Sequence, residues 1–217
     1  MTGDARRRAG RPADPVLTPE LIAQAGLRLL DESATGDFTM VELATSLGVR
    51  ASAIYNHVAG KDEVLARVRE LVSDRIDVSA FERMPWDEAV AVWARSYRIA
   101  FATHPRTIAL FAITPVAGAR RTVGMYEAVT RAFREAGWPP DRILTAVVAL
   151  ENFILGAALD LVAPGDILDP AGDEAAPALA EAYARQREAL GGEPPADAAF
   201  ELGLAALIAG LRAWRDA

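Results

Sequence analysis

Proline and glycine divide this sequence into segments, and within each segment apolar residues recur three and four positions apart. The stretch that begins at Lys61 shows the pattern through Val64, Leu65, Val68, Leu71 and Val72. This spacing is typical of one apolar face of an α-helix, and no run of alternating β-branched residues indicates a strand. The sequence therefore predicts an all-α fold.

The breaks place the expected helices and the division into domains. A first helix is expected to start at Thr18-Pro19-Glu20, because Thr caps a helix and Pro suits its first position. The later segments lie at about 39–47, 50–57, from 61 onward, 86–103, a short stretch after Pro105, 120–136, 141–162, 174–190 and 197–214. Met84-Pro85 marks the expected domain boundary. We predict a basic arm over 1–17, a first domain over 18–80 and a second over 81–217.

Residues 39–58 contain two short helices joined by a tight turn. Thr39 and Glu42 have the spacing of a capping box, and Gly48 ends the first helix because glycine accepts a left-handed turn without strain. Ala44 is small enough for two helices to cross closely. This pattern predicts a helix-turn-helix. A plain helical hairpin within a larger bundle is the alternative.

The second of these helices has an outer face with no core to fill. That face carries small and hydrogen-bonding residues, namely Ala51, Ser52, Tyr55 and Asn56. Such a face suits the major groove of DNA. The net charge of −7 would disfavour DNA binding if it were spread evenly over the chain. It is not, because four arginines lie within residues 1–11 beside one acid, Asp4.

The first third of the chain resembles the N-terminal domain of the tetracycline-repressor (TetR) family. The resemblance covers residues 18–65, and a Gly10-Arg11-Pro12 arm precedes it. The matching pieces are Leu43-Ala44, Leu47-Gly48-Val49, Ile54-Tyr55-Asn56-His57-Val58, Lys61 and Leu65. The resemblance implies a three-helix helix-turn-helix domain, followed by a helical domain that binds a ligand and forms a homodimer.

The resemblance also implies roles for individual residues in binding double-stranded operator DNA. The predicted DNA-binding residues are Arg11, Thr39, Arg50, Ala51, Ser52, Tyr55, Asn56, His57 and Lys61. Thr39 and Lys61 are expected at phosphates, and Tyr55 and His57 are expected to contact phosphates or to pack beside them. Arg11 is expected in the minor groove, and Arg50 at a base or a phosphate. Ala51, Ser52 and Asn56 are expected to face bases. Ala51 offers only a methyl group, so few direct base contacts are expected.

Residues 81–217 resemble the ligand-binding and dimerisation domain of the same family. Candidate ligand-binding residues are the aromatic residues Trp93, Tyr97, Phe111 and Tyr126, and the polar His104, Glu151 and Asn152. Ordinary core packing is the alternative for each. We expect a largely apolar or aromatic effector. Leu110 and Asn152 stand where the tetracycline-binding members have histidines, which argues against a metal–tetracycline complex, and no cofactor is expected.

Two segments combine small residues with an apolar surface and are expected at a subunit interface. The candidate dimerisation residues are Gly156, Gly203, Leu207, Gly210 and Leu211. Small residues let helices approach closely, and 197–214 is too apolar for the surface of a monomer. The alternative is that both helices are central to one large core.

Other classes of protein lack support in the sequence. There is no cysteine, there are two histidines, and no phosphate-binding glycine loop or nucleophile elbow is present, so we expect no enzyme. The basic start lacks an apolar signal core, and Glu151 and Asp160 interrupt the most apolar run, so we expect a cytoplasmic protein without a membrane partner. The predicted function is a repressor that a small effector releases from a palindromic operator. A helical adaptor and a co-repressed regulator are the alternatives.

Overall fold

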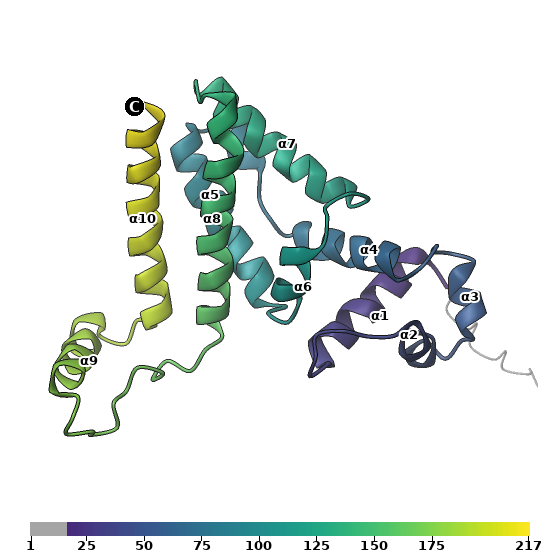
Figure 1. Ribbon diagram of the computed structural model, residues 1–217, viewed down its shortest axis with the longest axis horizontal. Coiled ribbons are helices and arrows are strands. Elements are labelled where there is room, and N and C mark those ends of the chain that lie inside the picture. The colour runs from purple at the N-terminus through teal and green to yellow at the C-terminus, as the bar shows by residue number, and fades with distance from the viewer. Residues whose placement is uncertain (1–16) are drawn as a thin grey trace, which may run out of the picture.

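A computed structural model describes residues 17–217, which form ten α-helices, one 3₁₀ helix and no strand (Figure 1). In chain order the elements are α1 (Pro19–Glu32), α2 (Met40–Ser46), α3 (Ala51–Tyr55), α4 (Lys61–Ser73), η1 (Ser79–Glu82), α5 (Trp86–Ala102), α6 (Thr107–Ile113), α7 (Arg120–Glu135), α8 (Pro140–Leu161), α9 (Pro177–Leu190) and α10 (Pro195–Arg215). The predicted all-α fold is confirmed.

The helix starts in the N-terminal domain follow from their capping residues. The Thr18 hydroxyl accepts a hydrogen bond from the Leu21 N–H at 3.2 Å. At α2 the Thr39 N–H donates to Glu42 at 2.7 Å, and the Glu42 N–H donates back to the Thr39 hydroxyl at 3.2 Å. Caps of this kind stabilise a helix by about 1 kcal/mol each. They fix where α1 and α2 begin, and thereby the position of α3.

Helix α4 joins the small N-terminal domain to the larger bundle. Its apolar stripe, Val64, Val68 and Val72, is completely buried. The helix packs against α1 on one side and against α5 and α7 on the other. In Figure 1 it runs from the α1–α3 domain into the bundle. A single helix therefore belongs to the cores of both domains.

The C-terminal bundle is built around α5 and α8. Helix α5 packs along α8, α10 covers another side of α8, and α7 contacts α4 and α8 (Figure 1). An aromatic cluster fixes one end of the bundle, with Trp86 5.1 Å from both Phe133 and Trp138, measured between ring centres. This framework holds open a cavity between α4 and α8.

Helix α8 is long and apolar enough to cross a membrane by length and composition alone. Core helices of soluble proteins meet the same criterion. Six α8 residues are buried within the bundle: Ile143, Ala146, Val147, Leu150, Ile154 and Ala158. The apolar character of α8 is therefore partly accounted for by packing within the subunit.

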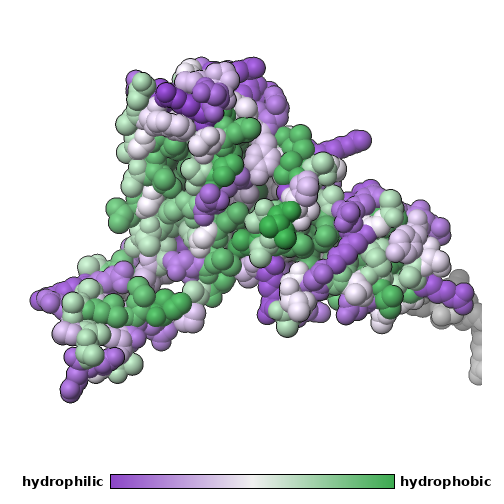
Figure 2. All heavy atoms as spheres, in the orientation of Figure 1, coloured by the Kyte–Doolittle hydropathy of each residue, from purple (hydrophilic) through white to green (hydrophobic). Residues whose placement is uncertain are grey.

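Helix α9 lies apart from the main body of the bundle, and none of its residues is buried (Figure 1). Figure 2 shows apolar surface on this arm and along the side formed by α8 and α10. Exposed apolar residues there include Ile167, Leu168, Leu179 and Leu202. Part of the apolar surface of the subunit therefore lies at the end remote from α3.

Candidate functional site

The turn between α2 and α3 has the geometry that the sequence predicts. Gly48 has a φ of +67°, in the left-handed region where glycine is favoured. Just beyond it, the Val49 N–H donates to the Ala44 carbonyl at 3.0 Å. Leu43 and Ile54, one from each helix, are completely buried. The pair is therefore held from beneath by apolar packing, which leaves the opposite face of α3 open.

The open face of α3 presents the predicted DNA-contacting side chains to solvent. Ser52, Tyr55, Asn56 and His57 are exposed, and Ala51 is half-buried. Among the residues that the structure describes, no hydrogen bond engages the side chains of the four exposed residues. Their polar groups are therefore free to meet a partner from solvent. Arg50, at the start of α3, is also exposed.

Two of the predicted phosphate contacts already have partners within the chain. The Thr39 hydroxyl donates to Glu42 at 2.9 Å. The Lys61 ammonium pairs with the Asp37 carboxylate and lies 5.4 Å from the centre of the Phe38 ring. Each group would have to exchange or share its partner on meeting a phosphate. Arg11, predicted for the minor groove, lies outside the described residues.

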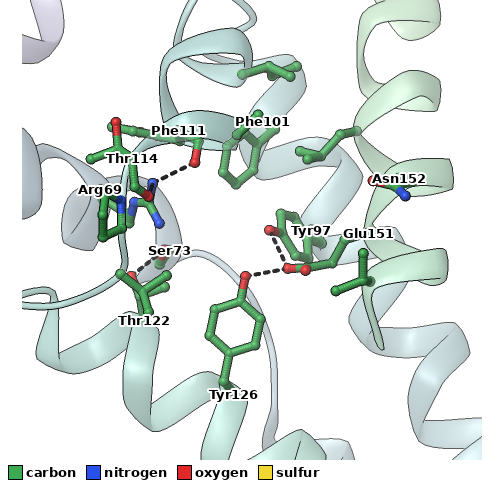
Figure 3. Close-up of a pocket in the computed structure, with 16 residues that line it drawn as sticks. Arg69, Ser73, Tyr97, Phe101, Phe111, Thr114, Thr122, Tyr126, Glu151 and Asn152 are labelled. Carbon is green, nitrogen blue, oxygen red and sulfur yellow. Dashed lines mark hydrogen bonds between the residues drawn. The ribbon is translucent and has the colours of Figure 1, made fainter. Parts of the chain in front are cut away.

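A cavity of about 350 Å³ lies within the bundle (Figure 3). Helices α4, α5, α6, α7 and α8 all contribute to its lining, as does the loop after α6. The lining residues are Arg69, Ser73, Tyr97, Phe101, Ile108, Phe111, Ala112, Thr114, Pro115, Val116, Thr122, Tyr126, Val148, Glu151, Asn152 and Leu155. A volume of this size, with mixed aromatic and polar walls, is typical of a site for a small organic molecule.

Glu151 forms the centre of a polar cluster on one wall of the cavity. The hydroxyls of Tyr97 and Tyr126 both donate to its Oε1 atom, at 3.0 and 2.6 Å (Figure 3). Burial raises the pKa of Glu151 above its ordinary value of 4.5, while the two hydrogen bonds and the charge of Arg69 oppose that rise. Burial likewise raises the pKa of both tyrosines. The two phenols therefore remain neutral donors to the carboxyl group.

Arg69 of α4 provides the cationic group of the cavity. Its Nη2 atom donates to the carbonyls of Phe111 and Thr114, at 2.6 and 2.7 Å, and its guanidinium lies 4.9 Å from the Phe111 ring centre. Burial lowers its pKa, but an arginine stays charged at neutral pH. Arg69 thus ties α4 to the C-terminal end of α6. A second tie is the Ser73–Thr122 hydroxyl pair, at 3.0 Å, between α4 and α7.

Five of the seven residues predicted for ligand binding line this cavity: Tyr97, Phe111, Tyr126, Glu151 and Asn152. Two lie elsewhere, which corrects the predicted set. Trp93 is completely buried in the core, beside Tyr97 and Phe81. His104 pairs with Asp31 of α1, with 2.8 Å between Nδ1 and Oδ2, and so contributes to the contact between the two domains.

Sequence reasoning missed Arg69, Ser73 and Thr122. A signal for Arg69 existed, because it is the charged residue that follows Val68 within the apolar stripe of α4. A charge directly beside a buried stripe is often an ordinary solvated residue, so the pattern alone did not select it. Its 6% exposure shows that the guanidinium is inside the protein.

The predicted dimerisation residues fall into two groups. Gly156 and Gly210 are exposed with open space around them, and Leu207 is half-buried. Gly203 and Leu211 face the inside of the subunit, which argues against their predicted role in dimerisation. An added Cβ at Gly203 would lie 2.6 Å from the ring of Phe153, and Leu211 is buried in the core. Gly203 therefore permits the close approach of α8 and α10 within one subunit.

The exposed side of α8 and α10 is nevertheless strongly apolar. We call it the α8–α10 face, and its exposed members are Leu144, Gly156, Leu159, Leu202 and Gly210. Contiguous apolar surface of this kind marks an interaction site in a soluble protein. The fold and these surfaces together define a helix-turn-helix DNA-binding regulator with a separate ligand-binding domain.

Comparison with known proteins identifies the family. Residues 82–215 match the model of the "Tetracyclin repressor-like, C-terminal domain". An HTH-type transcriptional regulator from Saccharopolyspora erythraea is 30% identical over 208 residues, which cover 92% of this chain and 86% of the relative. The chain therefore belongs to the tetracycline-repressor family, whose members are soluble DNA-binding regulators that form homodimers.

Solved structures agree in fold over nearly the whole chain. ActR from Streptomyces coelicolor, without ligand, matches with a TM-score of 0.71 and 26% identity, covering 94% of this chain and 97% of that one. A tetracycline repressor variant from Acinetobacter baumannii AYE, in complex with minocycline, matches with a TM-score of 0.74 and 25% identity, covering 93% and 96%. ActR has also been solved in complex with actinorhodin, with a TM-score of 0.68, 26% identity and coverage of 92% and 98%.

Proposed function

We propose that this protein is a cytoplasmic repressor that binds a palindromic operator as a homodimer and is released when a small aromatic molecule enters the cavity. The observation that carries the proposal is that one helix serves both sites. Helix α4 begins at Lys61, beside α3, and its residues Arg69 and Ser73 line the cavity. Arg69 is eight residues from Lys61, or about 12 Å along the helix. The proposal assigns no catalytic step to the chain.

The link between the two sites is mechanical. Two recognition helices read half-sites one helical turn of DNA apart, about 34 Å, so a small rotation of α4 in each subunit changes their fit. Arg69 and Ser73 tie α4 to α6 and α7 across the cavity. A molecule between these helices favours one position of α4 only if it binds that position more tightly. We expect a coupling of about 1–3 kcal/mol between effector and operator.

The operator is proposed to contact α3 and its flanks. Ser52 and Asn56 would meet base edges, with Ala51 offering a methyl group, while Tyr55, His57, Thr39 and Lys61 would meet phosphates. Arg50 would meet a base or a phosphate, and Arg11 stays a prediction for the minor groove. The support for this proposal is the exposure of the outer face of α3 and its lack of internal partners.

The α8–α10 face is proposed as the dimer interface. Its Gly156 and Gly210 would allow helices of two subunits to pack closely, and its leucines would be covered. Leu202 is 75% exposed in the subunit, so a substitution there tests the proposed interface most directly. Leu202→Glu should give a folded monomer in analytical ultracentrifugation, because a charge buried without a partner opposes association. The matched control is Leu179→Glu on α9. A dimer unchanged by Leu202→Glu contradicts this assignment.

The function is tested by selecting bound sequences from random duplex DNA, followed by a screen for molecules that change the binding. Fluorescence anisotropy of the selected duplex should show affinity that falls as salt rises. An effector should then lower the affinity about fivefold or more. Tighter binding with the effector would make this a co-repressed regulator. Absence of salt-dependent DNA binding would leave a helical adaptor.

A further inference from the structure

The polar groups of the cavity have hydrogen-bonding capacity that the protein leaves unused. Both tyrosine hydroxyls donate to the same oxygen of Glu151, Oε1. The other oxygen, Oε2, has no hydrogen-bond partner among the described residues, although Glu151 lines the cavity. A carboxylate has about four acceptor positions, and here two of them are filled. Glu151 can therefore accept a further donor from a molecule in the cavity.

The opposite wall carries the complementary group. Arg69 is 6% exposed and uses only Nη2 for its two carbonyl contacts. Its Nε atom is buried and has no partner within the described part of the chain. A buried donor without a partner costs free energy, more so when it is charged. Nη1 also makes no hydrogen bond in the described chain and, unlike Nε, is not enclosed, so Nη1 is the atom through which Arg69 can donate to a further acceptor.

These two groups do not satisfy each other. No ion pair joins Arg69 and Glu151 within residues 17–217. Figure 3 shows them on different walls of the cavity, Arg69 on α4 and Glu151 on α8. The open space lies between them, and the rings of Phe101, Tyr97 and Tyr126 border it. An ion pair between the two would close the cavity. Instead, two backbone carbonyls hold the Arg69 guanidinium on one wall, and two phenols hold the Glu151 carboxyl group on the other.

We propose that the effector is an aromatic molecule with two polar ends, an anionic oxygen that binds Arg69 and a hydrogen-bond donor that binds Glu151. This inference rests on the proposed function of the cavity as the effector site. A purely apolar molecule would displace water from both charged groups and replace none of their hydrogen bonds. A molecule with one polar end would leave the other wall unpaired. The aromatic rings of the lining supply the apolar contact between the two ends.

The chemistry is tested with three naphthalene probes on the unmodified protein. The first is 6-hydroxy-2-naphthoic acid, which has both groups. The second is 6-methoxy-2-naphthoic acid, which lacks only the donor proton, and the third is 2-naphthol, which lacks the carboxylate. By isothermal titration calorimetry the first should bind about tenfold more tightly than either of the others, as expected for a lost hydrogen bond to a charged group.

Variants assign each end of the probe to its wall. Glu151→Gln should remove most of the preference for hydroxyl over methoxy, and Arg69→Met should remove most of the preference for the acid over 2-naphthol. The matched controls are Glu127→Gln and Arg131→Met on the exposed side of α7, which should keep both preferences. The inference is overturned if the three probes bind the unmodified protein with equal affinity, or if none binds at about 1 mM. This test does not depend on whether Arg69→Met folds.

DNA binding in the same samples separates this inference from the proposed function. If the doubly polar probe binds with both preferences, the inference stands, and its effect on operator affinity then tests the function. If a different molecule releases the operator while the probes bind equally, the function stands and the inference fails.

Discussion

The outer face of α3 and the cavity wall around Glu151 both carry the polar residues of a binding site, but they are built in opposite ways. Ser52, Tyr55, Asn56 and His57 lie close together in the sequence, are exposed, and make no side-chain hydrogen bond in the described chain. The polar cluster of the cavity comes from separate helices, is buried or half-buried, and is joined by hydrogen bonds from Tyr97 and Tyr126 to Glu151. A site for a large charged partner needs only exposure, whereas a site inside the protein must hold its polar groups in place.

The difference predicts how the two sites respond to mutation. A side chain on the face of α3 can be removed with little effect on folding, because nothing in the subunit depends on it. Removal of a polar side chain in the cavity should destabilise the fold, because its hydrogen-bond partner is left buried and unpaired. Each prediction below tests one side of this contrast, beginning with the largest expected effect.

The largest effect is expected where α3 meets the core. Ile54→Ala should lower the free energy of unfolding by about 2–5 kcal/mol, because Ile54 is completely buried and its loss leaves a cavity. Urea denaturation followed by circular dichroism measures the change. Ser52→Ala, two residues away on the exposed face, is the control and should change stability by less than about 0.5 kcal/mol. Equal stability of the two variants would mean that α3 is not held as the structure describes.

The second prediction concerns the exposed face itself. Tyr55→Ala combined with Lys61→Ala should weaken DNA binding by about tenfold or more at low salt, because two phosphate contacts are lost. The unfolding transition should shift far less than for Ile54→Ala. Anisotropy titrations against the selected duplex measure the affinity, with Arg131→Met as a control for the loss of one positive charge elsewhere. Unchanged affinity in the double variant would move the recognition surface away from α3.

The third prediction uses the titration of Glu151. Because burial raises its pKa in the folded protein, the folded state holds a proton that the unfolded state has lost once the pH exceeds the ordinary value of 4.5. Stability from this group is therefore complete below that pH and is lost as the pH rises through the folded pKa. Glu151→Gln should remove this part of the pH dependence, seen in thermal melting at a series of pH values. Glu127→Gln should leave it intact, and an unchanged slope in Glu151→Gln would contradict the burial of a titrating group.

The smallest effect is expected at the edge of the DNA-binding surface. Asp37→Asn should strengthen DNA binding slightly, by about twofold to fivefold at low salt, because Lys61 no longer has a carboxylate partner that competes with phosphate. The gain should vanish at high salt. Asp62→Asn, which removes the neighbouring carboxylate, is the control for net charge. A loss of affinity in Asp37→Asn would show instead that this ion pair orients Lys61 for the phosphate.

The helical fold and the helix-turn-helix could be predicted from the amino-acid sequence alone. Both depend on residues near one another in the chain: the Thr39–Glu42 capping box, the left-handed Gly48, and apolar residues at helical spacing. The exposed residues of α3 could be chosen for the same reason, because a short helix with one buried side at Ile54 leaves the rest of its surface outside.

The packing of the helices had to be known before the polar residues of the cavity and the covered helical faces could be identified. Arg69 and Phe111 are 42 residues apart in the chain, and Tyr97 and Glu151 are 54 apart. His104 interrupts apolar sequence as Glu151 does, yet it meets Asp31 of α1 instead of the cavity. Leu211 and Leu202 belong to the same apolar helix, yet one is buried and the other is 75% exposed. Helical periodicity sets which residues share a face, but the neighbour that covers each face is set by packing between helices distant in sequence.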